Sequence, residues 1–203
     1  MRDLPPGATG LLVGAISYTL GVCALVGPGD MTLPTPCADW DLAMLLAHLN
    51  ASMADLETAI SAGTLDLECP PDHAAGDPVE ILRDRAAQLL CTAYCYDAPG
   101  RLVAVSGLPV PAGLVACTGA VEIAVHGWDI SAARDARRPI DPIPPALATR
   151  MLGLCPLLVA GREGLFAGPV KVPAQASPGD KLVAFLGRDP GTLPCGPALV
   201  TGE

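Results

Sequence analysis

The sequence predicts an all-α protein that folds as an up-down helical bundle with an extra helix and a partly extended C-terminal tail. Hydrophobic residues make up 51% of the 203 residues and aromatic residues only 3%, so a sizeable core is formed mainly by Ala, Leu and Val. Apolar residues recur at helical spacing in several segments, and stretches rich in Pro and Gly separate these segments.

The first helix is expected over residues 8–26, where Gly27-Pro28-Gly29 would end it. Residues 7–29 carry no charge and approach the roughly 20 residues that a membrane-spanning helix needs. The run also contains polar residues and several glycines, has no basic flank beyond Arg2, and lacks a convincing signal-peptide cleavage pattern. We therefore interpret it as a buried first helix of the bundle.

The second helix is expected to follow the turn at residues 35–41 and to end near Ala62. Asp39 is the expected N-cap, and Asp41 suits the first helical turn. The apolar positions of this segment follow helical spacing: Leu42, Leu45, Leu46, Leu49, Met53 and Leu56. His48 lies near this apolar stripe.

The remaining chain alternates between helices and segments broken by Pro and Gly. Further helices are expected over residues 78–97, 115–134, 144–160 and 178–187. A loop that contains His73 is expected over 63–77, and a short strand-like run over Arg101–Val105. Residues 1–165 should form the helical-bundle domain, and residues 166–203 a tail that packs on it.

Two side chains of the helix expected over 115–134 suggest a metal site. Glu122 and His126 are four residues apart, which places both on one face of the helix. A carboxylate beside an imidazole can bind a divalent metal, and His48 could complete three ligands if the two helices pack together. Asp129 is a candidate hydrogen-bond acceptor for a ligating histidine, or a further ligand.

Each of these residues also has a plainer interpretation. His48 could be a histidine at the edge of the core, Asp129 a surface charge near Arg134, and His73 a solvated loop residue. For Glu122 a functional role is favoured more strongly than a plain structural one, because Glu122 lies in an apolar run where an unpaired buried carboxylate is costly. The sequence contains no dinucleotide-binding or P-loop motif and no Gly-x-Ser-x-Gly motif, and nothing marks Cys117 as an activated thiol.

Charge and cysteine content limit the partners and the compartment. The net charge of −9 and the pI near 4.6 leave no basic face for phosphates, which argues against nucleic acid and anionic membranes. The eight cysteines are scattered and include no Cys-x-x-Cys motif, which favours buried free thiols and a cytoplasmic protein. The expected partners are a small-molecule substrate and, in a homodimer, a second copy of the chain.

Three segments give the chain a family resemblance. They are Thr35-Pro-Cys-Ala-Asp-Trp-Asp with Leu45-Leu-Ala-His-Leu, Glu122-Ile-Ala-Val-His-Gly-Trp-Asp-Ile, and the stretch from Val170 to Pro190 with its Gly187-Arg-Asp-Pro ending. On these segments the chain resembles the DinB-like, mycothiol-dependent maleylpyruvate isomerase-like superfamily, in its actinobacterial metal-binding subgroup. The resemblance implies an up-down four-helix bundle whose metal ligands fall on His48, Glu122 and His126.

The resemblance also implies a chemistry. It points to zinc, with nickel or iron as alternatives, and to mycothiol as a thiol that the metal activates for addition to a small electrophile. The reaction would be an isomerisation or an S-transfer. We do not expect the larger C-terminal domain of the isomerase in this chain, and we therefore do not expect maleylpyruvate to be its substrate. Two alternatives stay open: a metalloenzyme that needs no thiol and serves a specialised or natural-product pathway, and a non-catalytic metal- or ligand-binding module. The Gly187-Arg-Asp-Pro ending is most simply structural.

Overall fold

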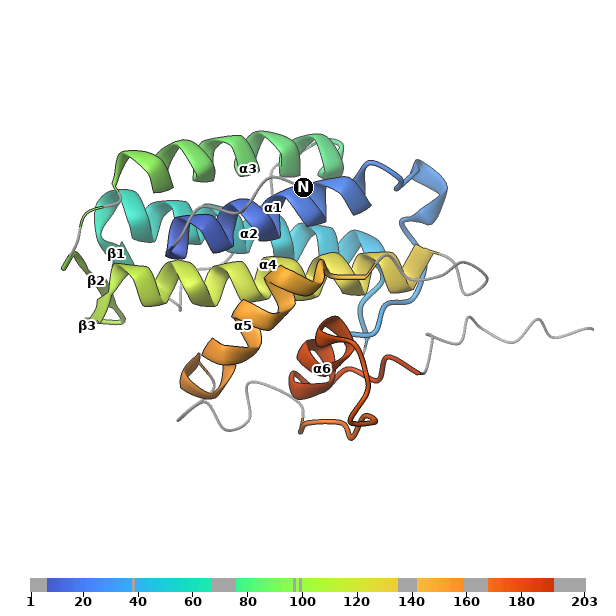
Figure 1. Cartoon of the computed structure of the whole chain (residues 1–203). Helices are drawn as coiled ribbons and strands as arrows, with labels where there is room; N and C mark the ends of the chain where they lie inside the picture. Colours follow the sequence, from blue (N-terminus) through green and yellow to red (C-terminus); the bar gives the residue numbers. More distant parts are fainter. Residues whose placement is uncertain are drawn as a thin grey trace, which may run out of the picture.

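A four-helix bundle forms the centre of the protein, which confirms the predicted fold class (Figure 1). The computed structural model describes residues 7–37, 39–66, 76–96, 98, 100–134, 142–158 and 168–191. The bundle helices are α1 (Ala8–Cys23), α2 (Leu42–Ala62), α3 (Pro78–Cys95) and α4 (Ala112–Arg134). The shorter helix α5 (Pro145–Leu158) packs against α1 and α4, and α6 (Pro178–Phe185) packs against α5.

The bundle helices run in the order up, down, down, up. Strand β1 (Thr64–Leu65) follows α2 directly and pairs in parallel with β2 (Leu102–Val105), which follows α3, so α2 and α3 finish at the same end of the bundle. Strand β3 (Leu108–Pro111) pairs antiparallel with β2 and leads directly into α4, which runs back along the bundle. This order makes α2 and α4 antiparallel neighbours.

The three-stranded sheet at this end was only partly predicted. The strand-like run at Arg101–Val105 is confirmed as β2, but β1 lies within the expected loop 63–77. Strand β3 contains two prolines, which lack a backbone N–H and are tolerated because β3 is an edge strand. Ser106 and Gly107 both adopt positive φ angles in the tight turn between β2 and β3. Helix α4 begins directly after the hairpin, at Ala112, which is three residues earlier than the expected start at residue 115.

The predicted N-cap of α2 was wrong. Asp41 caps the helix, because its Oδ1 accepts the backbone N–H of Met44 at 2.8 Å. Asp39 instead has a φ of 66° and lies in the turn before the helix. A β-bridge between Pro34 and Asp41 closes this turn, so the helical conformation begins only after Asp41.

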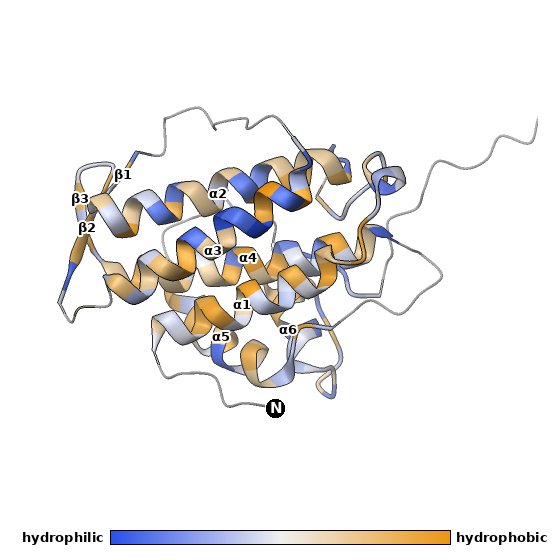
Figure 2. Cartoon of the chain, turned by 90° about the horizontal axis from the view of Figure 1, so that it is seen from above, coloured by the Kyte–Doolittle hydropathy of each residue, from blue (hydrophilic) through white to orange (hydrophobic). Residues whose placement is uncertain are grey.

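Helix α1 is buried, as expected for the first helix of the bundle. Leu12 and Ile16 are almost completely covered, and Figure 2 shows hydrophobic residues along both α1 and α4. The helix ends at Cys23, three residues before the expected end at residue 26, and a 3-10 turn, η1, follows at Pro28–Asp30. Among the described helices, none combines the length and apolar character that crossing a membrane requires.

Two glycines allow α4 to approach its neighbours closely. A methyl group on Gly127 would overlap the hydroxyl of Thr19 on α1 and lie 3.1 Å from the ring of Tyr18. Thr19 also donates a hydrogen bond of 2.8 Å to the carbonyl of Ile123 across the same interface. A methyl group on Gly119 would overlap the side chain of Leu56 on α2. These contacts fix how deeply α4 sits between α1 and α2.

Replacing Gly127 by alanine should destabilise the protein by about 1–3 kcal/mol, because the added methyl overpacks the interface between α1 and α4. Urea unfolding measures this change. Gly113→Ala is the matched control on the same helix, because a methyl there meets only Ala8 at 3.9 Å. Its stability should stay equal or rise by up to about 1 kcal/mol through helix propensity. Equal stability of the two variants would contradict the close packing.

Candidate metal centre

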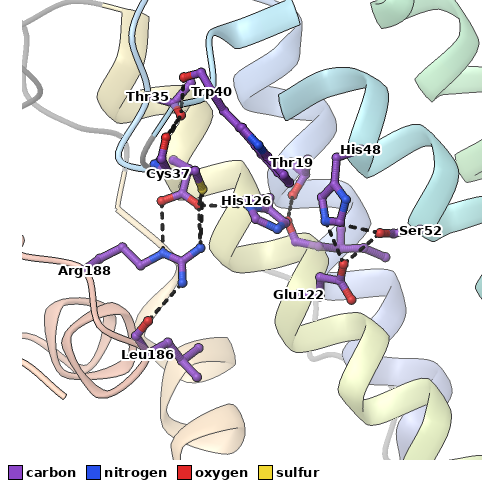
Figure 3. Close-up of polar contacts among 12 residues, drawn as sticks. Thr19, Thr35, Cys37, Trp40, His48, Ser52, Glu122, His126, Leu186 and Arg188 are labelled. Atoms are coloured by element: carbon purple, nitrogen blue, oxygen red, sulfur yellow. Dashed lines mark hydrogen bonds and ion pairs between the residues drawn. The ribbon is translucent and has the colours of Figure 1, made fainter. Parts of the chain in front are cut away.

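Side chains from α2 and α4 meet in the bundle and point toward one another (Figure 3). His48 Nε2 lies 3.2 Å from Glu122 Oε1. The rings of His48 and His126 are nearly perpendicular, with their centroids 5.1 Å apart. One ligand atom from each of these three residues lies within 4.8 Å of the other two. The structure thus brings together the three predicted ligands, and metal binding by them stays a prediction.

The antiparallel packing of α2 and α4 explains this meeting of residues distant in sequence. Leu56 of α2 faces Gly119 of α4. Because the helices run in opposite directions, the residues before Leu56 on α2 lie beside the residues after Gly119 on α4. His48 of α2 therefore faces Glu122 and His126 of α4. The ring of Trp40, just before α2, covers His48 with a centroid distance of 4.8 Å.

Ser52 is a polar neighbour that the sequence analysis missed. It lies one turn after His48, and its hydroxyl donates a hydrogen bond of 2.7 Å to Glu122 Oε1. The same hydroxyl lies 3.5 Å from His48 Nε2. The four-residue spacing between His48 and Ser52, which places both on one helix face, was the available signal.

The carboxylate of Glu122 is ionised at neutral pH. Burial raises the pKa of Glu122, but the hydrogen bond with His48, the nearby His126 and the hydrogen bond from Ser52 outweigh burial and lower this pKa to about 2. About a third of the side chain stays exposed, with 37% of its surface accessible. Glu122 is therefore an anionic donor that a cation can reach.

Asp129 lies on the other side of His126 and is completely buried. Its Oδ2 atom is 2.9 Å from His126 Nδ1, so this hydrogen bond leaves Nε2 as the free nitrogen of the ring. The guanidinium of Arg188 makes two contacts with the same carboxylate, 3.3 Å from Nε to Oδ1 and 3.0 Å from Nη2 to Oδ2. Asp129 thus occupies the place expected of an acceptor for His126, and it is not a surface charge near Arg134.

The charge on Asp129 is balanced by these partners. Burial raises the pKa of the Asp129 carboxyl, but the hydrogen bond with His126 and the charge of Arg188 more than offset burial and lower this pKa below its ordinary value. Cys37 Sγ donates a weak hydrogen bond of 3.4 Å to Oδ2. Asp129 therefore stays ionised and holds three donors from three parts of the chain.

A second group of possible metal donors, Cys37, His126 and Asp129, also lies within 4.8 Å. Arg188 already supplies the positive charge there, with its Nη2 atom 3.7 Å from Cys37 Sγ. Burial and the Asp129 carboxylate raise the pKa of the Cys37 thiol to about 12, so it is protonated at neutral pH, whereas metals bind the thiolate. The group of His48, Glu122 and His126 is therefore the better candidate for a metal site.

Arg188 is the part of this network that sequence reasoning did not connect to the site. It belongs to the Gly187-Arg-Asp-Pro ending, which was expected to be structural, and it lies 59 residues from Asp129 in sequence. No spacing rule reveals a contact across that separation. His73, Cys69 and Cys195 lie outside the described residues. Cys117 is partly covered, and burial raises the pKa of its thiol.

Comparisons with known proteins agree with the resemblance in the sequence. Residues 14–131, more than half of the chain, match the family described as mycothiol maleylpyruvate isomerase N-terminal domain. Two relatives are uncharacterized proteins of Mycobacterium tuberculosis, one from strain CDC 1551 and one from strain H37Rv. Each is 26% identical over 162 residues, which cover 76% of this chain and 83% of the relative. No solved structure matches significantly.

Asp129→Asn should destabilise the protein at pH 7 by about 3–5 kcal/mol, because it leaves the largely covered guanidinium of Arg188 without the counter-charge of the fully buried Asp129 carboxylate. The folded-state pKa of Asp129 is lowered, so the stability from its ionised form is fully present above about pH 4, near the unfolded pKa. That stability is lost as the pH falls through the lowered pKa. The gap between wild type and variant should therefore narrow below about pH 4.

Urea unfolding between pH 3 and pH 7 measures this gap. The matched control is Asp84→Asn, since Asp84 is exposed on α3, and its stability should follow that of the wild type across the range. A gap for Asp129→Asn that stays constant with pH would contradict the ionised pair.

Proposed function

The chain belongs to the mycothiol maleylpyruvate isomerase N-terminal domain family, and from this membership and the site geometry we propose that it is a metal-dependent enzyme. It would be of the isomerase or S-transferase type and activate a thiol cofactor for addition to a small electrophilic substrate. The observation that carries the proposal is the convergence of His48, Glu122 and His126 on one point between α2 and α4.

The chemistry of these residues fits a divalent metal. Two imidazoles and one carboxylate form the donor set of many catalytic zinc sites, which keep a fourth position open for a substrate or water. Glu122 is ionised, and His126 has one nitrogen fixed by Asp129 and the other free. We therefore propose zinc as the metal. Nickel and iron are the alternatives, because nitrogen and oxygen donors suit them as well.

A bound divalent ion lowers the pKa of a thiol that coordinates it and so supplies a nucleophile at neutral pH. The residues of the chain then have separate tasks. His48, Glu122 and His126 would hold the ion. Ser52 fixes the Glu122 carboxylate by its hydrogen bond, and Asp129 fixes the His126 ring. Arg188 keeps Asp129 in place and balances its charge.

A cavity gives reactants access to this point. It has a volume of about 480 Å³, and its lining includes His48, Ser52 and Glu122. Volumes of roughly 300–1,000 Å³ are usual for small-molecule sites.

Mycothiol as the thiol is inferred from the family. A cytoplasmic location is inferred from the cysteine pattern of the sequence.

The proposal predicts that the wild-type chain binds about one zinc ion and that His48→Ala, His126→Ala and Glu122→Gln each lose most of it. Elemental analysis after dialysis measures the bound metal, and circular dichroism checks that each variant is folded. Glu57→Gln is the matched control on α2, because Glu57 bonds to Thr92 and is outside the cluster. Cys37→Ser should also keep the metal. Stoichiometric zinc in both histidine variants would contradict the assignment, and zinc loss in Cys37→Ser would favour the second donor group.

The same samples test the thiol cofactor. Calorimetry should detect mycothiol binding to the zinc-loaded wild type, and binding should weaken at least about tenfold without zinc or in His126→Ala, because the metal holds the sulfur. Zinc binding without detectable mycothiol binding would contradict the thiol-dependent proposal and favour a metalloenzyme that needs no thiol.

A further inference from the structure

The cavity beside the proposed metal ligands has one polar end and one apolar wall. His48, Ser52 and Glu122 form the polar end. The apolar wall, as we use the term, consists of side chains from the sheet and from the start of α4: Leu65, Val105, Val110, Leu114 and Val115.

The register of the sheet explains this wall. Leu65 pairs with Val105, and Val103 pairs with Val110, so these four side chains share one face of the sheet. Val103 is fully buried against the bundle, which shows that this face is directed inward. Val105 and Val110 are only partly covered and line the cavity. The hairpin thus adds aliphatic surface to the cavity that His48 and Glu122 also line.

The charged residues in the described lining are both acidic. They are Glu122 and Asp55, and no Lys or Arg belongs to the described lining residues. The positive charge of Arg85 on α3 favours the ionised form of Asp55, but Arg85 is not one of the lining residues. A divalent ion at the polar end would have the Glu122 carboxylate as a ligand and the Asp55 carboxylate nearby, and no Lys or Arg of the described lining adds positive charge for an anionic substrate.

The cavity should bind charged and uncharged ligands with different affinity. A carboxylate that enters the cavity gives up hydration without gaining a cationic side chain as partner, which is unfavourable. An uncharged apolar molecule instead buries aliphatic surface, and the removal of that surface from water is favourable. The lining therefore selects by charge as well as by size.

We propose that this cavity takes an uncharged, mainly apolar electrophile, with Val105 and Val110 as specificity-determining residues, and that it disfavours carboxylate-bearing substrates such as maleylpyruvate. The role of the molecule as substrate rests on the proposed function. The preference of the cavity for uncharged ligands rests on the lining alone and can be measured without metal.

Two fluorescent probes with the same aromatic skeleton test this preference. N-phenyl-1-naphthylamine is uncharged, and 8-anilino-1-naphthalenesulfonate adds one sulfonate. Fluorescence titration of the full chain, with and without zinc, should give a dissociation constant at least about tenfold lower for the uncharged probe. Val110→Arg should reverse or abolish this ratio, because it places a cation in the apolar wall.

A second variant and a control keep the test independent of folding. Leu114→Arg changes a wall residue that is already 38% exposed, and it should shift the ratio in the same direction. Leu25→Arg alters a leucine that is 56% exposed outside the lining, and it should leave the ratio unchanged. Equal or tighter binding of the sulfonate by the wild type, or an unchanged ratio in both wall variants, would overturn the inference.

The outcome separates this inference from the proposed function. A chain that binds zinc but prefers the sulfonate probe keeps the proposed function and overturns the assignment of the cavity. A chain that prefers the uncharged probe but binds no zinc supports the assignment of the cavity and contradicts the proposed function.

Discussion

The hydrogen bond between His126 and the buried carboxylate of Asp129 is the interaction on which the rest of the site depends. A fully buried carboxylate is tolerated only when charged or hydrogen-bonding partners surround it. Asp129 meets this requirement with His126 from its own helix, Arg188 from the C-terminal segment and Cys37 from the turn before α2. One buried charge therefore orients a proposed metal ligand and joins three distant parts of the chain.

The packing of α4 provides the rigid frame for this network. Gly119 and Gly127 let α4 lie close to α2 and α1, and the Thr19 hydroxyl bonds to the backbone of α4 between them. Because α2 and α4 are antiparallel, His48 comes to lie opposite Glu122 without any contribution from loops. Sites carried by packed helices hold their geometry better than sites on loops, which suits a centre that must position a ligand set.

Local sequence patterns predicted much of this arrangement, and its limits have physical causes. The four-residue spacing of Glu122 and His126 placed them on one face, and the apolar stripe around His48 indicated a helix that packs in the bundle. Arg188 and Cys37 escaped prediction because contacts across 59 and 92 residues depend on tertiary packing. Strands β1 and β3 escaped because one has two residues and the other two prolines. The N-cap error at Asp39 came from a β-bridge that delays the start of α2.

We propose that His48, Glu122 and His126 bind one metal ion through two imidazole nitrogens and one carboxylate oxygen. Zinc X-ray absorption spectroscopy on the zinc-loaded chain, recorded without added thiol, tests the donor set directly. We expect nitrogen and oxygen neighbours of the zinc at about 2.0–2.2 Å, with the outer-shell scattering of two imidazoles. A sulfur neighbour at about 2.3 Å, or a spectrum without imidazole scattering, would contradict it.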